Sequence, residues 1–268
     1  MIFNKLVIVR GGGDLASGTI HKLHRCGFRV LVLELPKPTS IRRKVSFSEA
    51  VYDGEVTIEG VTAVLAGSMN EIEKAWDENK IPVAIDPEGE WIKKLIPSVL
   101  VDAMIAKRNL GTTKDMADIV IGLGPGFIAG KDVDVVIETV RGHNLGRLIF
   151  EGEAEKNTGV PGDIEGYSSE RVIHSPEEGI IENIKDIGAI VEKDEVIARV
   201  GNALIRAKIP GVLRGIIRDG SYVKKGLKIA DVDPRLTEKA NCFTISDKAR
   251  NIAGGVLEAI LYMMKDEL

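Results

Sequence analysis

The segments SPEEGIIENIKDIGAIVEKDEVIARV (175–200) and AKIPGVLRGIIRDGSYVKKGLKIADV (207–232) repeat one pattern at an offset of 32 residues. The positions that match are Gly179/Gly211, Ile184/Ile216, Gly188/Gly220, Val191/Val223, Lys193/Lys225, Ile197/Ile229, Ala198/Ala230 and Val200/Val232. Each copy predicts a strand after its first glycine, a turn, a second strand, another turn and a third strand. Two such copies, related by a pseudo-twofold axis, predict a small closed sandwich.

This pattern resembles the barrel-sandwich domains that carry biotin or lipoate, whose two halves meet at a hairpin with the modified lysine. The corresponding hairpin here runs from Val200 to Leu204 and contains no lysine. Lys208 lies beyond the hairpin, within the second copy. We therefore expect no biotin or lipoate, and a binding, docking or purely structural role for the repeat.

The composition restricts the class of protein. The chain has 268 residues, of which 44% are apolar and 28% charged, which suits one large or two modest globular domains. A net charge of −4 and the lack of a basic stripe argue against a nucleic-acid partner. Two cysteines, no secretory leader and no long apolar run predict a cytoplasmic protein without a membrane-spanning segment.

The first part of the chain alternates apolar strands with helical stretches, which predicts a parallel sheet. The expected strands are 6–9, 30–35, 61–65, 83–86, 100–106, 119–123, 133–138 and 148–150. The predicted fold class is α/β: a Rossmann-like parallel-sheet domain over 1–168, a duplicated barrel-sandwich domain over 169–236, and a C-terminal amphipathic helical segment over 237–268.

A glycine-rich turn, RGGGDLASG at 10–18, follows the first expected strand and opens the first expected helix. Read as G-x-G-x-x-A, it uses Gly11 for a sharp turn and Gly13 for close approach of a pyrophosphate to the backbone. A carboxylate at the end of the second strand would accept ribose hydroxyls. The predicted cofactor-binding residues here are Gly11, Gly12, Gly13, Asp14, Gly18 and Glu34. Asp14 would repel a pyrophosphate, so two alternatives stay open: Asp14 caps the helix, or the glycines serve only the turn.

A second glycine turn follows the strand expected at 119–123 and comes after a polar stretch that contains Lys107 and Arg108. Loops at the carboxyl ends of parallel strands converge on one crevice, so this turn is expected to face the first. The predicted cofactor-binding residues of this region are Lys107, Arg108, Gly122, Gly124 and Gly126, with the two cations neutralising phosphate.

His143 and Cys242 are the candidate catalytic residues. His143 lies in the polar cluster ETVRGHNLGR (138–147), where an imidazole would act as a general base, the alternative being an ordinary surface loop. Cys242 precedes a helix that Ser246 is expected to cap, and the helix N-terminus and Lys248 are expected to lower the pKa of its thiol. Such a thiol would suit handling of sulfur or selenium, the alternative being a buried structural cysteine.

No intrinsic metal is expected. His21 and His24 share a helix face, but Cys26 points away from it, so these residues do not make a ligand set.

Five strings together resemble one family: VRGGGDLASGTIHKLHRCGFRVLVLE (9–34), RRKVSFSEAVYDGEV (42–56), VDAMIAKRNLGTTKDMADIVIGLGPGF (101–127), ETVRGHNLGR (138–147) and CFTISDKARNIAGGVLEAIL (242–261). This is the YqeB-type accessory protein family of selenium-dependent molybdenum hydroxylase systems, which is distantly like XdhC-type maturation factors. The resemblance implies an intracellular maturation factor that assists cofactor loading or insertion of selenium or sulfur. Its implied partners are molybdenum hydroxylase apo-enzymes or cofactor-biosynthesis proteins.

Together these observations predict that the crevice between the two glycine turns binds a molybdopterin dinucleotide or another nucleotide. An NAD-dependent oxidoreductase acting on a small substrate and a non-catalytic docking scaffold are the alternatives. Whether the protein is an enzyme, and whether it forms a homo-oligomer, stays open at this point.

Overall fold

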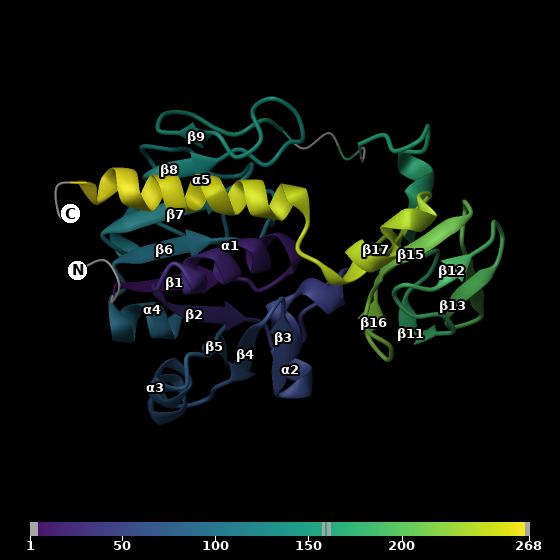
Figure 1. The fold of residues 1–268 in the computed structure, drawn as a ribbon, viewed down its shortest axis with the longest axis horizontal. Helices are drawn as coiled ribbons and strands as arrows, with labels where there is room; N and C mark the ends of the chain where they lie inside the picture. Colours follow the sequence, from purple (N-terminus) through teal and green to yellow (C-terminus); the bar gives the residue numbers. More distant parts are fainter. Residues whose placement is uncertain (1–4, 157–158, 160–161, 266–268) are drawn as a thin grey trace. The chain divides into compact units, whose positions relative to one another are not determined.

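The computed structural model describes residues 5–156, 159 and 162–265. The chain forms two compact units (Figure 1). Unit 1 comprises Met1–Pro38, Ser46–Asn157 and Ile245–Leu268, and unit 2 comprises Thr39–Val45 and Thr158–Thr244. Each unit is therefore built from segments that are not consecutive in the sequence.

Unit 1 is built on a nine-stranded sheet in the order β3-β4-β5-β2-β1-β6-β7-β8-β9. Its strands are β1 (Leu6–Arg10), β2 (Arg29–Glu34), β3 (Glu55–Ile58), β4 (Val61–Leu65), β5 (Ile81–Ile85), β6 (Val99–Asp102), β7 (Ile119–Leu123), β8 (Val135–Ile137) and β9 (Leu148–Ile149). The pairs from β4 to β8 are parallel, and the edge strands β3 and β9 are antiparallel to their neighbours. Central strands such as β1 are apolar on both faces because helices cover both.

Helices pack on the two faces of this sheet. The helices of unit 1 are α1 (Asp14–Arg25), α2 (Ala50–Asp53), α3 (Met69–Asp77), α4 (Glu90–Leu95) and α5 (Asp247–Met263), with short 3-10 turns η3 (Phe47–Glu49) and η4 (Lys114–Met116). Residues of α1 and α5, such as Ile20 and Val256, share a core with Val7 and Val9 of β1. Ile8 of β1 faces the opposite core, with Ile72 of α3 and Ile92 of α4. Alternate residues of one strand thus serve two cores.

The helices α1 and α5 lie against each other, as Figure 1 shows. A Cβ atom added at Gly18 would stand 2.6 Å from the Ala249 carbonyl oxygen, so this contact requires glycine. Further along the pair, Lys22 Nζ donates to the Arg250 carbonyl oxygen at 3.1 Å. Because later residues of α1 contact later residues of α5, the two helices run in the same direction. Both helices begin at the carboxyl edge of the sheet.

Unit 2 contains two four-stranded antiparallel sheets, β10-β17-β15-β12 and β14-β13-β11-β16. Its elements are β10 (Val172–His174), β11 (Gly179–Asn183), β12 (Ile190–Val191), β13 (Val196–Val200), β14 (Ala203–Arg206), β15 (Gly211–Ile216), β16 (Tyr222–Val223), β17 (Lys228–Asp233), η2 (Arg43–Val45), η5 (Ser169–Arg171) and η6 (Leu236–Phe243). Both sheets contribute to one apolar core that includes Ile181, Ile197, Val212 and Ile229.

The sequence repeat is visible in these strands. β11, β12 and β13 begin at residues 179, 190 and 196, and β15, β16 and β17 begin at 211, 222 and 228, each 32 residues later. Each copy places its short middle strand in the sheet of the other, since β12 pairs with β15 and β16 pairs with β11. Gly179 and Gly211 both have positive φ, at 155° and 154°.

The predicted fold class, a Rossmann-like parallel sheet followed by a barrel-sandwich and a C-terminal amphipathic helix, is wrong. The first sheet is mixed, because the Glu59-Gly60 turn, with φ of 46° and 80°, folds β3 back on β4, and β9 closes the other edge antiparallel to β8. The second unit consists of two separate antiparallel sheets. The final helix joins unit 1, because its apolar stripe packs on α1 and the sheet. The boundaries therefore differ from the predicted 1–168, 169–236 and 237–268.

No helix among the described residues is long and apolar enough to cross a membrane.

Candidate ligand site at the carboxyl edge of the sheet

The chain changes direction across the sheet at β1. From β1 it passes to β2 on one side, and it later returns to β6 on the other side of β1. In open sheets of this type, ligands bind outside the carboxyl ends of the strands where the order reverses. The loops after β1, β2, β6, β7 and β8 therefore define the region in which a ligand site is expected.

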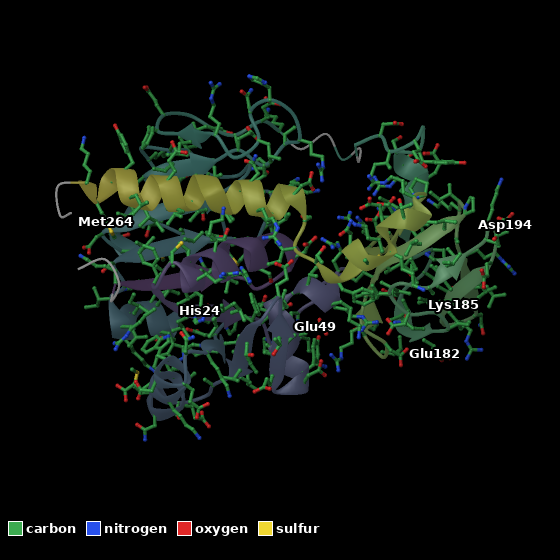
Figure 2. The ribbon with its side chains drawn as sticks, viewed as in Figure 1. His24, Glu49, Glu182, Lys185, Asp194 and Met264 are labelled. Atoms are coloured by element: carbon green, nitrogen blue, oxygen red, sulfur yellow. The ribbon has the colours of Figure 1, made fainter. Side chains whose placement is uncertain are left out.

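The first glycine turn is held from several sides. Gly11 has φ of 93°, and its N–H donates to the Leu33 carbonyl oxygen at 2.8 Å. The Gly12 carbonyl accepts from the Ser48 N–H at 2.9 Å and from the Ser17 hydroxyl at 3.0 Å. The Ser17 hydroxyl in turn accepts from the Phe47 N–H at 2.9 Å. The segment around η3, which Glu49 ends (Figure 2), thus fixes the turn before any ligand arrives.

Glu34 closes the same turn with its carboxylate. Gly12 N–H donates to Oε1 at 2.6 Å and Leu35 N–H donates to Oε2 at 2.8 Å. The side chain is 9% exposed, and this burial raises the pKa of Glu34 above its ordinary value. Each oxygen retains a lone pair that can accept a further donor.

Asp14 is the first residue of α1 and not its cap. The N-cap is Gly13, whose backbone is extended and which has no side chain to cap the helix. The first amide groups of α1 lack the usual Ser, Thr, Asp or Asn acceptor. An anion at this end of the helix would be stabilised by those amides and by the helix dipole.

A buried polar network ends β1 and β6. Arg10 Nη1 donates to the Thr112 hydroxyl at 2.6 Å, and that hydroxyl donates to Asp102 Oδ2 at 2.6 Å. Arg10 Nη1 stands 3.6 Å from the same carboxylate oxygen. Asp102 is 1% exposed, and burial raises its pKa above the ordinary value. No local sequence pattern marks this network, because Thr112 reaches it from a loop ten residues away from Asp102.

The second glycine turn packs on the loop that holds Lys107 and Arg108. A Cβ atom added at Gly126 would lie 2.6 Å from the Arg108 backbone nitrogen, and one added at Gly124 would lie 2.6 Å from the Thr139 hydroxyl oxygen. Gly11 packs less tightly on the start of this loop, with 3.2 Å from the added Cβ to the Ala103 carbonyl oxygen. Both glycine turns thus pack on the same loop. At Gly122, the space that a Cβ atom would need is occupied by the Phe127 side chain.

The Lys107 loop has a strained backbone. Ile105 and Lys107 have φ of 54° and 61°, in the left-handed region that side-chain-bearing residues seldom adopt. The side chains of Lys107 and Arg108 are exposed. Both side chains are therefore accessible to solvent or to a ligand.

The loop after β8 begins with a buried carboxylate. Glu138 is 3% exposed and accepts from the backbone N–H groups of Thr139, Val140 and Glu155, at 2.7 to 2.8 Å. These three hydrogen bonds give Glu138 a structural role, because they hold the backbone of the loop. His143 lies further along the same loop and is exposed. No neighbour was found that would fix its ring in a catalytic orientation among the described residues.

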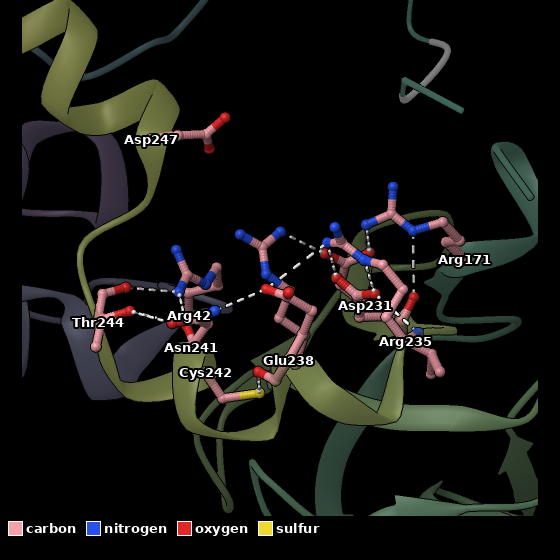
Figure 3. A network of polar contacts seen from close by, with 12 residues as sticks. Arg42, Arg171, Asp231, Arg235, Glu238, Asn241, Cys242, Thr244 and Asp247 are labelled. Atoms are coloured by element: carbon pink, nitrogen blue, oxygen red, sulfur yellow. Dashed lines mark hydrogen bonds and ion pairs between the residues drawn. The ribbon is translucent and has the colours of Figure 1, made fainter. Parts of the chain in front are cut away.

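Cys242 lies in unit 2, in the polar network of Figure 3. Its thiol is 1% exposed and donates to the Glu238 carbonyl oxygen at 3.8 Å. The expected lowering of its pKa is wrong: burial raises the pKa of the thiol, although Arg42 and Arg214 act in the other direction. Ser246 does cap α5, accepting from the Ala249 N–H at 3.2 Å.

No group of three or more metal-ligating side chains occurs within the described parts of the chain. His21 Nε2 lies 3.4 Å from the Glu59 carbonyl oxygen, and burial lowers the pKa of His21 and of His24, which Figure 2 labels.

The chain is similar to one curated relative along nearly all of its length. The uncharacterized protein YqeB of Escherichia coli strain K12 is 49% identical over 261 residues, which cover 97% of this chain and 48% of that protein. The chain thus spans about half the length of this relative. The predicted resemblance to YqeB-type proteins is supported to this extent, and no family model matches the chain.

Solved structures that resemble the chain have low similarity scores. The apo ectoine utilization protein EutE (DoeB) from Ruegeria pomeroyi matches with 12% identity and a TM-score of 0.26, over 85% of this chain and 86% of that one. An aspartoacylase family protein from Mesorhizobium loti matches with 14% identity and a TM-score of 0.30, over 87% and 85%. A succinylglutamate desuccinylase/aspartoacylase from Rhodobacter sphaeroides matches with 12% identity and a TM-score of 0.28, over 87% of each chain. Such scores assign no activity to this protein.

The predicted function as a maturation factor for selenium-dependent molybdenum hydroxylases is wrong by these comparisons. Neither the curated relative nor the search for a family model links the chain to such a factor. The relative's name gives no link to molybdenum or selenium. The alternatives, an NAD-dependent oxidoreductase and a docking scaffold, gain no observation from them.

Proposed function

We propose that unit 1 binds a nucleotide at the carboxyl edge of its sheet. The observation that carries this proposal is the Glu34 carboxylate, which is fixed against the Gly12 amide at 2.6 Å. A carboxylate at the end of β2 that is held beside a glycine turn is suited to accept the two hydroxyl groups of a ribose. A bound sugar would replace the solvation that burial has removed from this carboxylate.

The phosphate end of the ligand would lie toward α1. Gly13 opens this helix without a side-chain cap, so its first amides can donate to phosphate oxygens. The bonds that hold the Gly12 carbonyl fix the turn in advance, so binding costs little ordering of the backbone. Lys107 and Arg108 would add positive charge from the loop that packs on both glycine turns.

Calorimetry and thermal unfolding test this proposal with AMP, ADP, NAD, molybdopterin dinucleotide, adenosine and inorganic phosphate. At about 100 times its dissociation constant, a bound nucleotide stabilises the fold by roughly 2.7 kcal/mol. Glu34→Gln removes the charge and one acceptor for ribose, so we expect nucleotide affinity to fall about 10- to 100-fold.

Asp86→Asn is the matched control. Asp86 is also a buried carboxylate at the end of a strand of this sheet, but it caps α4 through the Glu90 and Trp91 amides at 3.0 and 2.8 Å. The Asp86→Asn substitution should lower the free energy of unfolding and leave nucleotide affinity unchanged. Equal losses of affinity in both variants, or no binding of any nucleotide by the unaltered protein, would contradict the proposal.

The partners expected from the sequence resemblance, molybdenum hydroxylase apo-enzymes or cofactor-biosynthesis proteins, stay predictions, as do the self-association of the chain and its cytoplasmic location.

A further inference from the structure

Lys248 occupies a defined place at the carboxyl edge. The residue before it, Asp247, forms a two-bond ion pair with Arg141 of the loop after β8, at 2.7 and 2.9 Å. The residue after it, Ala249, packs on Gly18 of α1. Lys248 therefore stands in the first turn of α5, with α1 on one side and the loop after β8 on the other.

The Lys248 ammonium is half-buried and lacks a direct partner. Within the residues that the structure describes, it makes no hydrogen bond and no ion pair. A cation in the first turn of a helix is also disfavoured by the helix dipole. A half-buried charge without a hydrogen-bond acceptor is costly, and a bound anion would remove that cost.

Charged groups of every neighbouring element act on this amine. Asp14 of α1, Glu138 at the end of β8 and Asp247 of α5 favour its protonated form, and Arg141 opposes it. Burial has the largest effect, and it lowers the pKa of Lys248 below the ordinary value. Glu138 is already bound to three backbone amides, so it is not available to reorient toward the amine.

We propose that Lys248 is the residue that binds the anionic phosphate group of the ligand at the carboxyl edge. Its place in the first turn of α5, next to the Ala249–Gly18 contact with α1, brings it toward the start of α1, where the proposed nucleotide would direct its phosphates. This inference deepens the proposed function and rests on it for the nucleotide part of the ligand. The contact itself requires only a phosphate group.

The first experiment compares ADP with adenosine by calorimetry for the unaltered protein and for Lys248→Met and Lys248→Arg. Loss of a charge-assisted bond should weaken ADP binding by about 10- to 100-fold in Lys248→Met and leave adenosine binding unchanged. Lys248→Arg should recover part of the loss. Affinity for ADP in the unaltered protein should fall as pH rises through the pKa of Lys248, and Lys248→Arg should show no such fall.

Lys22→Met is the matched control. Lys22 is also a lysine between α1 and α5, where its Nζ donates to the Arg250 carbonyl oxygen at 3.1 Å, and it lies in the last turn of α1. We expect this variant to bind ADP with unchanged affinity. An equal loss in Lys22→Met and Lys248→Met would show that disturbance of the helix pair, not loss of a phosphate contact, weakens binding.

Protection from amine acetylation, read by mass spectrometry with inorganic pyrophosphate as the probe, separates this inference from the nucleotide proposal. Protection of Lys248 by pyrophosphate, in a protein that binds no nucleotide, would uphold the phosphate contact and overturn the nucleotide. Nucleotide binding that depends on Glu34, with Lys248 neither protected nor required, would overturn the inference alone. Absence of both binding and protection would overturn both.

Discussion

Buried acids are compensated differently in the two units. In unit 2, Arg171 and Asp231 (Figure 3) are 5% and 6% exposed, with Arg171 Nη2 3.7 Å from the carboxylate. Asp233 accepts two side-chain bonds from Arg235 at 2.8 and 2.9 Å. In unit 1, Glu34 has only backbone donors, and Asp102 accepts from a hydroxyl and an amide, with Arg10 Nη1 3.6 Å from its carboxylate.

The pKa shifts follow this difference. The hydrogen bonds and charge of Arg235 outweigh burial and lower the pKa of Asp233, whereas burial dominates and raises the pKa of Glu34 and Asp102. An acid neutralised inside the protein stabilises its own unit. An acid that the protein leaves only partly compensated is suited to a ligand, and this supports the proposal that the ligand site lies in unit 1.

The largest expected effect comes from removing a guanidinium in unit 2. Arg171→Met leaves Asp231 with Arg214, whose Nη1 is 3.6 Å from its carboxylate, and also removes bonds to the Val232 and Gly162 carbonyl oxygens. We expect a loss of about 3 kcal/mol in the free energy of unfolding, measured by urea denaturation. A loss below about 1 kcal/mol would show that this pair does not anchor unit 2.

Asp102→Asn should have a smaller effect in unit 1. Burial already opposes ionisation of Asp102, and asparagine retains an acceptor for the Met104 amide and a polar group for Thr112. We expect a loss of about 1 kcal/mol at neutral pH, measured by the same denaturation. A loss as large as that of Arg171→Met would remove the distinction between the two units.

The pH dependence of stability should differ in sign between the units. The raised pKa of Glu34 means that its contribution is complete below the unfolded value of 4.5 and is lost as pH rises through the folded pKa. The lowered pKa of Asp233 means that its contribution is complete above 3.8 and is lost as pH falls below that value. Glu34→Gln should therefore flatten the stability profile above pH 4.5, and Asp233→Asn should flatten it below pH 3.8, in unfolding measured across this range. Profiles that change in the same window in both variants would contradict the comparison.

The smallest effect is expected at an exposed ion pair of unit 2. Arg199 donates to Glu182 (Figure 2) at 2.7 Å, but the two side chains are 50% and 62% exposed. Arg199→Ala should change the free energy of unfolding by about 0.5 kcal/mol or less, by denaturation at low and high salt. A loss comparable with that of Arg171→Met would mean that the charge pair, rather than its burial, decides stability in this unit.

Local patterns predicted much of the fold. The strand expected at 61–65 is β4, as predicted, and that at 119–123 is β7. The repeat is reproduced strand by strand, and Ser246 caps α5. The strand β3 was missed, because four alternating residues are too short to stand out, and the strand is held in the sheet by pairing with β4 and packing against η3.

The site was predicted only in part. Gly11, Glu34 and the second glycine turn lie at the carboxyl edge, as the alternation of strands and helices indicated. Ser48, Thr112 and Lys248 were not assigned a place in it. Each reaches the edge from a segment far along the chain or from an irregular loop, where hydrophobic periodicity gives no signal.

The sequence by itself determined the elements that depend on neighbouring residues: the repeat of unit 2, the buried central strands, the glycine turn before α1 and the cap of α5. Their signals are local, since apolar period, backbone freedom of glycine and a capping hydroxyl act within a few residues. Only the tertiary structure decided that α5 belongs to unit 1, that Thr39–Val45 belongs to unit 2, that Glu34 binds the Gly12 amide, and that Lys248 has no direct partner among the described residues. These outcomes depend on which faces of distant segments pack together. Many small contacts and desolvation costs together decide this packing, and no short stretch of sequence contains them all.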